Sequence, residues 1–198
     1  MRYPKAIQNL IDKLSSLPSV GPKTAERYAF FLFQQDETKL AELSQAITNI
    51  HKETTICKSC VAVAEASPCS ICSDANRNQA TVCVVENIQD LVAIEATKQY
   101  NGRYFVLGGL IDTISGTGPE NLNIAKLATL VQSGQVKELI LALNFTLEGE
   151  TTALYLNKTF RDKLKITRLA KGLPAGSDLE YADQTTLSSA LTNRGEIN

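Results

Sequence analysis

The sequence predicts a multidomain α+β protein in which a helical N-terminal region precedes an α/β domain with a parallel sheet. Apolar residues recur at helical spacing up to about residue 50. Beyond residue 79, β-branched runs alternate with helical segments, and four cysteines separate the two regions. These patterns indicate three successive parts, with expected bounds of 1–53, 54–76 and 79–170.

The N-terminal region is expected to contain three helices. Their apolar stripes cover 7–14, 25–33 and 40–50, and we expect the third stripe to complete one helical unit. Pro18 ends the first helix, and Gly21 is expected to adopt a positive φ in the tight turn that follows. Pro22 suits the first position of the second helix, where its missing N–H costs nothing.

The start of the second helix is a candidate anion site. Its free amides attract anions, and Lys23 and Arg27 share one face because they lie four residues apart. An ordinary turn with solvated cations is the alternative. The string Leu17-Pro-Ser-Val-Gly-Pro-Lys-Thr-Ala25 resembles a helix-hairpin-helix, which holds the DNA backbone without reading sequence, although Ser19 stands where glycine is usual.

Four cysteines form two CxxC pairs, Cys57 with Cys60 and Cys69 with Cys72. Two such turns offer four thiolates to one tetrahedral ion, so a structural zinc finger is predicted. Two disulfides or four unrelated thiols are the alternatives. The odd fifth cysteine and the lack of an apolar leader favour a reducing compartment. Because residues 61–68 are few, we expect the metal rather than a core to order this segment.

The α/β region is predicted from regular alternation of strands and helices. The expected strands are 81–85, 104–107, 138–142 and 165–168, and the expected helices are 90–99, 121–132 and 148–164. Strands joined through helices require right-handed crossovers, which place the strands parallel in a buried sheet. The first strand is apolar on both faces, so we expect it to be central and its Cys83 to be an apolar filler.

Glu86 at the end of the first strand, followed by a helix containing Asp90, resembles the start of a Toprim domain. In Toprim enzymes this glutamate does acid–base work, and a DxD motif after the third strand holds magnesium. Here Asn144-Phe145 follows that strand, and Glu148 and Glu150 are as easily explained as charges at a helix start. We therefore expect the Toprim fold without a catalytic residue. The alternative is a nuclease or primase-like enzyme that gathers magnesium through its glutamates.

Taken in order, these parts resemble the RecR family of bacterial recombination mediators along almost the whole chain. Further matching strings are Gly102-Arg-Tyr-Phe-Val-Leu107, Gly116-Thr-Gly-Pro-Glu120, Glu148-Gly-Glu-Thr-Thr-Ala-Leu-Tyr155 and Thr167-Arg-Leu-Ala-Lys-Gly-Leu-Pro174. Three positions depart from the usual family pattern. Asp112-Thr113 replaces a Ser-Pro pair, Phe145 replaces a proline, and Ser177 replaces a glycine.

The resemblance implies a DNA-binding repair and recombination protein that is not an enzyme. It implies a ring-like homo-oligomer, dimer or tetramer, assembled through the N-terminal helices and a helical C-terminal extension (171–198). The ring would clamp DNA and act with RecO and RecF to load recombinase at single-strand gaps. By position, Lys23 and Arg27 would contact DNA. The acidic residues expected to dock RecO are Glu86, Asp90, Glu148 and Glu150.

Composition is compatible with this expectation. A formal net charge of −1 provides no bulk basicity, so any DNA contact must come from a local patch. No apolar run is long enough to span a bilayer, and the expected location is the bacterial cytoplasm, in association with the nucleoid. An oligomeric scaffold that binds only proteins remains the alternative to DNA binding.

Overall fold

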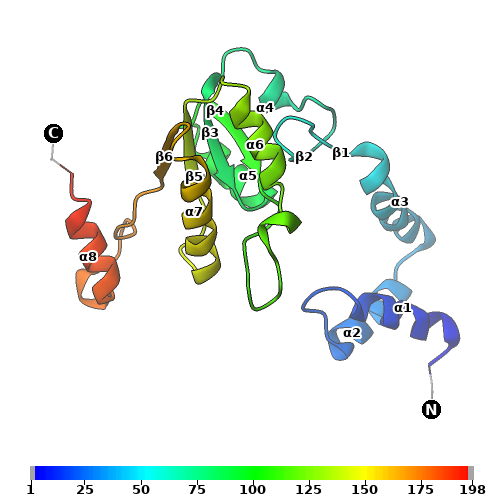
Figure 1. Cartoon of the computed structure of the whole chain (residues 1–198). Helices are drawn as coiled ribbons and strands as arrows, with labels where there is room; N and C mark the ends of the chain where they lie inside the picture. Colours follow the sequence, from blue (N-terminus) through cyan, green and yellow to red (C-terminus); the bar gives the residue numbers. More distant parts are fainter. Residues whose placement is uncertain (1–2, 196–198) are drawn as a thin grey trace. The chain divides into compact units, whose positions relative to one another are not determined.

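The computed structural model describes residues 3–195 and divides into two compact units, Met1–Thr54 and Thr55–Asn198 (Figure 1). The outermost residues of the expected N- and C-terminal parts, 1–2 and 196–198, lie outside the described residues. Within 3–195, no helix combines the length and the apolar character needed to cross a membrane.

The first unit consists of three helices, as predicted: α1 (Lys5–Ser15), α2 (Pro22–Phe33) and α3 (Glu37–Glu53). A small core joins α1 to α2. Ile11 of α1 and the two alanines Ala25 and Ala29 of α2 are buried there. Because alanine has only a methyl side chain, the two helices can approach closely at these positions. The predicted place of Pro22 at the first position of α2 is confirmed.

The turn between α1 and α2 differs from the prediction in which residue takes the left-handed conformation. Gly21 has an extended backbone with φ −77°, so the expectation of a positive φ there is wrong. Ser19 instead has φ +62°, and the Val20 amide donates to the Leu17 carbonyl at 3.1 Å to close the turn. A residue with a Cβ pays roughly 1 kcal/mol for this conformation, which glycine adopts freely.

Helix α3 begins where the Asp36 side chain accepts a hydrogen bond from the Lys39 amide at 3.0 Å. Helix α3 belongs to the first unit, as expected, but its apolar stripe is not covered by the rest of that unit. None of the residues of α3, all of which the structure describes, is buried. The exposed apolar members of the stripe are Leu40, Leu43, Ile47 and Ile50. The periodicity therefore predicted the helix correctly, and it left open whether the stripe is buried within the unit.

The second unit is built on a four-stranded parallel sheet in the order β4-β3-β5-β6, which confirms the predicted parallel sheet. The strands are β3 (Asn78–Val85), β4 (Gly102–Val106), β5 (Glu138–Ala142) and β6 (Lys165–Arg168). The helices between them are α5 (Ile88–Ala96), α6 (Ile124–Gln132), preceded by a 3₁₀ turn η1 (Pro119–Asn121), and α7 (Leu147–Phe160).

Several helix bounds differ from the predicted ones by one to four residues, and two of them have a clear local reason. Helix α5 begins two residues earlier than expected because the Asn87 side chain caps it, accepting from the Asp90 amide at 3.0 Å. Helix α7 ends at Phe160 rather than at residue 164. The amides of Lys163 and Leu164 both turn back to the Phe160 carbonyl, at 2.9 and 3.3 Å.

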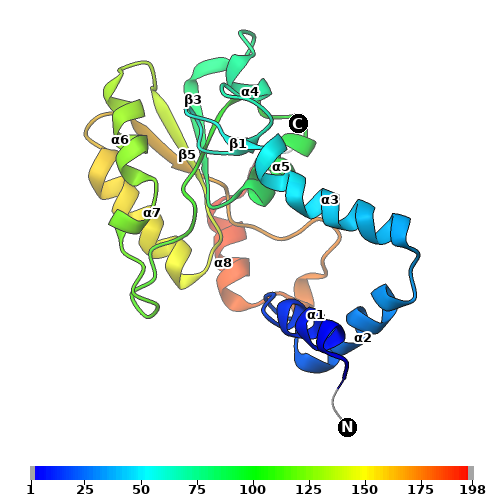
Figure 2. The same cartoon turned by 90° about the vertical axis from the view of Figure 1, so that its right-hand side faces the viewer.

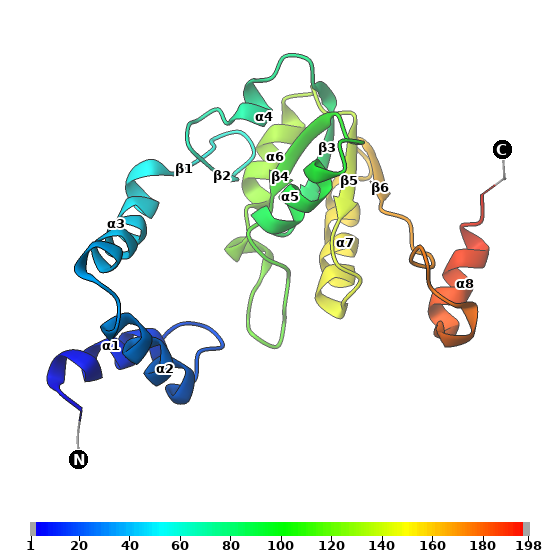
Figure 3. The same ribbon diagram turned by 180° about the vertical axis from the view of Figure 1, so that it is seen from behind.

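Helices cover both faces of the sheet (Figures 2 and 3). Side chains alternate across each strand, so Val82 and Val84 of β3 join the core beneath α6 and α7. Cys83 and Val85 face the opposite core, beneath α5. All four residues are at most 2% exposed, which confirms that β3 is a central strand and that Cys83 is a buried filler.

The cysteine segment contains two short strands and one helical turn: β1 (Thr55–Ile56), β2 (Val63–Ala64) and α4 (Ser70–Ser73). The chain ends in the predicted helical extension, with the 3₁₀ turn η2 (Leu179–Tyr181) and α8 (Gln184–Thr192). Asp183 caps α8 by accepting from the Thr186 amide at 2.9 Å.

Candidate functional site

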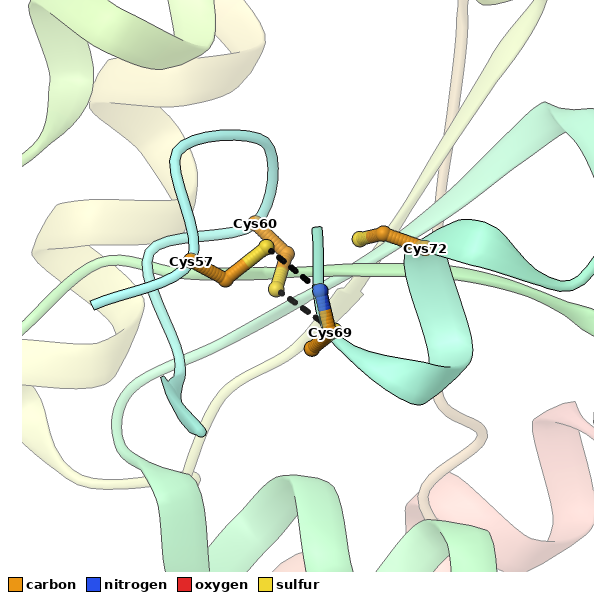
Figure 4. Close-up of side chains that lie close together, drawn as sticks. All are labelled: Cys57, Cys60, Cys69 and Cys72. Carbon is orange, nitrogen blue, oxygen red and sulfur yellow. Dashed lines mark hydrogen bonds between the residues drawn. The ribbon is translucent and has the colours of Figure 1, made fainter. Parts of the chain in front are cut away.

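The four predicted cysteine ligands converge on one position (Figure 4). All four Sγ atoms lie within 4.8 Å of one another, and Cys60 Sγ is 3.7 Å from Cys69 Sγ. A tetrahedral zinc ion with Zn–S bonds of about 2.3 Å would separate its sulfur ligands by about 3.8 Å. The cysteines are free thiols. Their number, type and spacing therefore fit a closed four-thiolate metal site.

Two turns position these thiols. Cys57 directly follows β1, and its turn is closed by the Val61 amide, which donates to the Cys57 carbonyl at 2.9 Å. Cys69 lies just before α4, and Cys72 lies within it. The Cys69 amide donates to Cys57 Sγ at 3.4 Å, so the second turn stabilises a thiolate of the first.

The cysteine segment also packs into the protein core, which corrects the expectation that metal alone would order it. Cys57, Cys60 and Cys69 are buried in the same cluster as Val85 and Tyr104 of the sheet. The segment is also tied to the sheet edge, because the Val106 amide at the end of β4 donates to the Cys60 carbonyl at 2.8 Å. The neighbouring sheet could not be inferred from the local sequence of this segment.

The thiols perturb one another's ionisation. A hydrogen bond with the Cys72 thiol lowers the pKa of Cys60 to about 5. The same interaction raises the pKa of Cys72, followed in importance by burial and by the charge of Cys60. One thiolate forms readily and then opposes ionisation of its neighbours. A divalent cation at the centre would remove this opposition by balancing the negative charges.

The two predicted DNA-contacting residues project into solvent from the start of α2. The Lys23 side chain is 96% exposed and lies 3.8 Å from a Glu26 carboxylate oxygen. Arg27 is also exposed, with its guanidinium 5.6 Å from the centre of the Tyr28 ring. Exposed cations beside the free amides of a helix N-terminus can bind phosphate oxygens.

The predicted acidic residues do not form a single group. Glu86 follows β3 and Glu148 lies in the first turn of α7, and both line a cavity of about 370 Å³ at the carboxyl edge of the sheet. Asp112 lines the same cavity and was not predicted as a site residue. Its position in the loop after β4 was the available signal, since loops after parallel strands meet at this edge.

Asp112 also shapes the turn in which this chain lacks the Ser-Pro pair. Its carboxylate accepts hydrogen bonds from the amides of Ile114 and Ser115, at 2.8 and 3.3 Å. Its backbone pairs with Thr117 in both directions, at 2.9 and 2.8 Å. The side chain therefore supplies the local hydrogen bonds that shape this turn, as Asp commonly does in loops.

Glu150 faces away from this cavity toward two cations. Its carboxylate accepts from Arg168 at 2.5 Å and from Lys171 at 2.7 Å. These bonds, Arg168 first, lower the pKa of Glu150. Asp90 lies in the first turn of α5, outside the cavity lining. Across residues 3–195, the cysteines are the one group of three or more ligating side chains close enough to hold a metal ion.

Fold and site together define a class of protein in which a helix-hairpin-helix unit precedes a Toprim domain with a four-cysteine cluster. Family models match in this order: the RecR helix-hairpin-helix over residues 7–51, the Toprim domain over 80–170 and the RecR C-terminal region over 172–194.

Curated relatives match along their full length. Recombination protein RecR of Bifidobacterium animalis subsp. lactis is 48% identical over 100% of this chain and 99% of its own. Those of Heliobacterium modesticaldum and Staphylococcus aureus (strain Mu50) are 46% and 44% identical, over 98% and 100% of each chain. The chain belongs to the RecR family of recombination proteins.

Proposed function

We propose that this chain is a recombination mediator that binds DNA through Lys23 and Arg27 and is not itself an enzyme. The observation that carries the proposal is the exposure of both cations at the start of α2, within the region that matches the RecR helix-hairpin-helix. The absence of a DxD motif and the ion pairing of Glu150 argue against a magnesium-dependent reaction.

Salt-dependent DNA binding tests this proposal. Fluorescence anisotropy with gapped DNA would compare the wild type with Lys23→Glu/Arg27→Glu. A control with the same change in net charge is Lys126→Glu/Lys158→Glu, in which the two cations are exposed on α6 and α7 of the second unit. The wild type should lose affinity with a log–log slope of about 0.9 per phosphate contacted on duplex, or about 0.7 on single strands.

The variants separate local contact from bulk charge. The Lys23/Arg27 variant should bind at least tenfold more weakly than the control at equal salt. Equal binding by all three proteins would place DNA contact elsewhere on the chain. A lack of wild-type binding would favour the protein-only scaffold, or a need for a partner.

We propose that the four cysteines hold one structural zinc ion. Metal analysis of the purified protein should find one zinc per chain. Cys60→Ser should lose it, whereas Cys83→Ser, which alters a buried cysteine outside the cluster, should retain it. Equal metal content in both variants would contradict the assignment.

We propose that the chain forms a ring-like homo-oligomer, a dimer or tetramer, that clamps DNA. The exposed apolar stripe of α3 supports this, because burying it against a second copy would remove Ile47 and its neighbours from water. Each subunit would add a weak DNA contact to a multivalent clamp. Ile47→Glu should therefore lower the mass measured by sedimentation equilibrium, and an unchanged mass would exclude α3 from the interface.

We propose that RecO docks on the acidic side chains Glu86, Asp90, Glu148 and Glu150. We also propose that RecO and RecF together with this chain load recombinase at single-strand gaps in the bacterial cytoplasm. Glu86 and Glu148 support this surface best, since they share one open cavity. Calorimetric titration with purified RecO should show weaker binding by Glu86→Gln/Glu148→Gln. Asp162→Asn, an exposed charge beyond the end of α7, is the control.

The expected sequence bounds then correspond to proposed functional parts. Residues 1–53 would bind DNA, 54–76 would hold zinc, 79–170 would dock partner proteins and 171–198 would contribute to oligomerisation. The two compact units support a division near residue 54.

A further inference from the structure

Four side chains from separate segments meet where the C-terminal segment leaves the sheet. Phe145 comes from the loop after β5, and Glu150 from the first turn of α7. Arg168 ends β6, and Lys171 lies three residues further on. The Arg168 guanidinium carbon is 4.3 Å from the centre of the Phe145 ring, and Lys171 Nζ is 4.6 Å from it.

The chemistry of this group is mutually supporting. Each cation contacts the face of the same aromatic ring and donates to the same carboxylate, Glu150. The ring attracts cations through its quadrupole, and the carboxylate keeps the two like charges together. Two nitrogen atoms of Arg168, Nε and Nη2, are buried without a hydrogen-bond acceptor. The electron-rich ring face partly compensates this loss of water.

The group lies where the segment that leads to η2 and α8 leaves the sheet. The chain passes from Lys171 into η2 and α8, and the Asn193 side chain at the end of α8 donates back to the Lys171 carbonyl at 3.2 Å. Phe145 and Lys171 also line a cavity of about 300 Å³ together with Asp183 and Ser189, at the start and in the body of α8. A displacement of Lys171 would therefore be transmitted to α8.

We propose that Phe145, Glu150, Arg168 and Lys171 form a clasp that holds the start of the C-terminal segment against the α/β domain. Phe145 is its positioning residue, because the ring is the one surface that both cations share besides Glu150. The clasp sets the direction in which residues 172–195 leave the sheet. The effect of the clasp on the geometry of the oligomeric ring rests on the oligomerisation proposed above, whereas the clasp itself does not.

Native-state trypsin cleavage measures the clasp directly, since trypsin cuts after Arg168 and Lys171. The variant Phe145→Leu keeps an apolar side chain and removes the ring face. The control Leu147→Ala truncates a side chain that is 73% exposed in the adjacent first turn of α7. Phe145→Tyr restores the aromatic face and serves as the conservative rescue.

Cleavage after Lys171 should be about fourfold to twenty-fivefold faster in Phe145→Leu, because each of two cation–π contacts is worth roughly twofold to fivefold in the closing equilibrium. Phe145→Tyr and Leu147→Ala should be cut at the wild-type rate. Adding Glu150→Gln to Phe145→Leu should accelerate cleavage by less than the product of the two single effects, since both act on the same cations.

Three results would overturn the clasp: equal cleavage rates for wild type and Phe145→Leu, failure of tyrosine to restore protection, or independent effects of Phe145 and Glu150. Hydrogen exchange over residues 169–178 provides the same comparison without a protease. If Phe145→Leu failed to fold, exchange in the folded Phe145→Tyr and Glu150→Gln proteins would still decide the question. DNA binding through α2 enters none of these measurements, so the clasp and the mediator function can fail separately.

Discussion

The buried hydroxyl of Thr152 should be among the most sensitive polar groups of the α/β unit. Thr152 is 0% exposed in α7, and its Oγ1 accepts a hydrogen bond from the Ile111 amide at 2.8 Å. The same hydroxyl donates to the Glu148 carbonyl at 2.7 Å. It therefore anchors the loop after β4, which carries Asp112, to the helix that carries Glu148.

The substitution Thr152→Val keeps the shape of the side chain and removes both bonds. The Glu148 carbonyl still has its main-chain partner one turn later in the helix, so its loss is small. The Ile111 amide, in a residue only 6% exposed, is left without an acceptor. An unsatisfied buried donor costs about 1–3 kcal/mol. A loss of about 2 kcal/mol should lower Tm by about 4–8 °C in a unit of this size.

Differential scanning calorimetry would measure the change, with Thr159→Val as the matched control. Thr159 makes the same hydroxyl-to-carbonyl bond on α7, to Tyr155 at 2.8 Å, but it is exposed. We expect the control to change stability by less than about 0.5 kcal/mol. The Ile111 amide should also exchange faster in Thr152→Val. Equal Tm shifts in the two variants, or unchanged exchange at Ile111, would refute the assigned role of this hydroxyl.

Three further predictions concern stability. Gly149→Ala would place a Cβ 1.9 Å from the Asn144 carbonyl oxygen, so urea unfolding should show a free energy of unfolding lower by about 1–3 kcal/mol. The control Gly172→Ala places its Cβ in open space and should be nearly neutral. Arg168 and Lys171 lower the pKa of Glu150. The stabilisation of the fold by this carboxylate is therefore complete above the ordinary glutamate pKa and is lost as pH falls through the lowered value. The difference in urea midpoint between wild type and Glu150→Gln should vanish in acid. Chelating the proposed zinc should raise hydrogen exchange along β4 as well as around the cysteines, because they share one core. Exchange confined to the cysteine turns would contradict that coupling.

Much of the architecture follows from local pattern. The β-branched runs and the helices between them lead to a parallel sheet because only helical crossovers connect such strands over these distances. The spacing of the cysteines predicts their convergence, since each CxxC turn already brings two thiols together. Pro22 marks the start of α2 because proline tolerates that position best.

Local pattern was insufficient wherever the outcome depended on a neighbour distant in sequence. The left-handed residue of the first turn is Ser19 rather than the expected Gly21, because the path of the whole turn, not the intrinsic freedom of glycine, selects it. The α3 stripe has helical periodicity, but periodicity does not say whether a partner surface exists within the same chain.

The acidic residues show most clearly the difference between what local sequence predicts and what only the tertiary structure decides. Sequence placed four carboxylates near the ends of strands and the starts of helices, and that placement was correct for each. Only the tertiary structure separated Glu150, which two cations from β6 and the following segment neutralise, from Glu86 and Glu148, which share a cavity with Asp112. Sequence alone determined which elements form, because hydrophobic period and turn chemistry are local. Tertiary structure decided which charges remain available to a partner, because pairing depends on groups that meet only after folding.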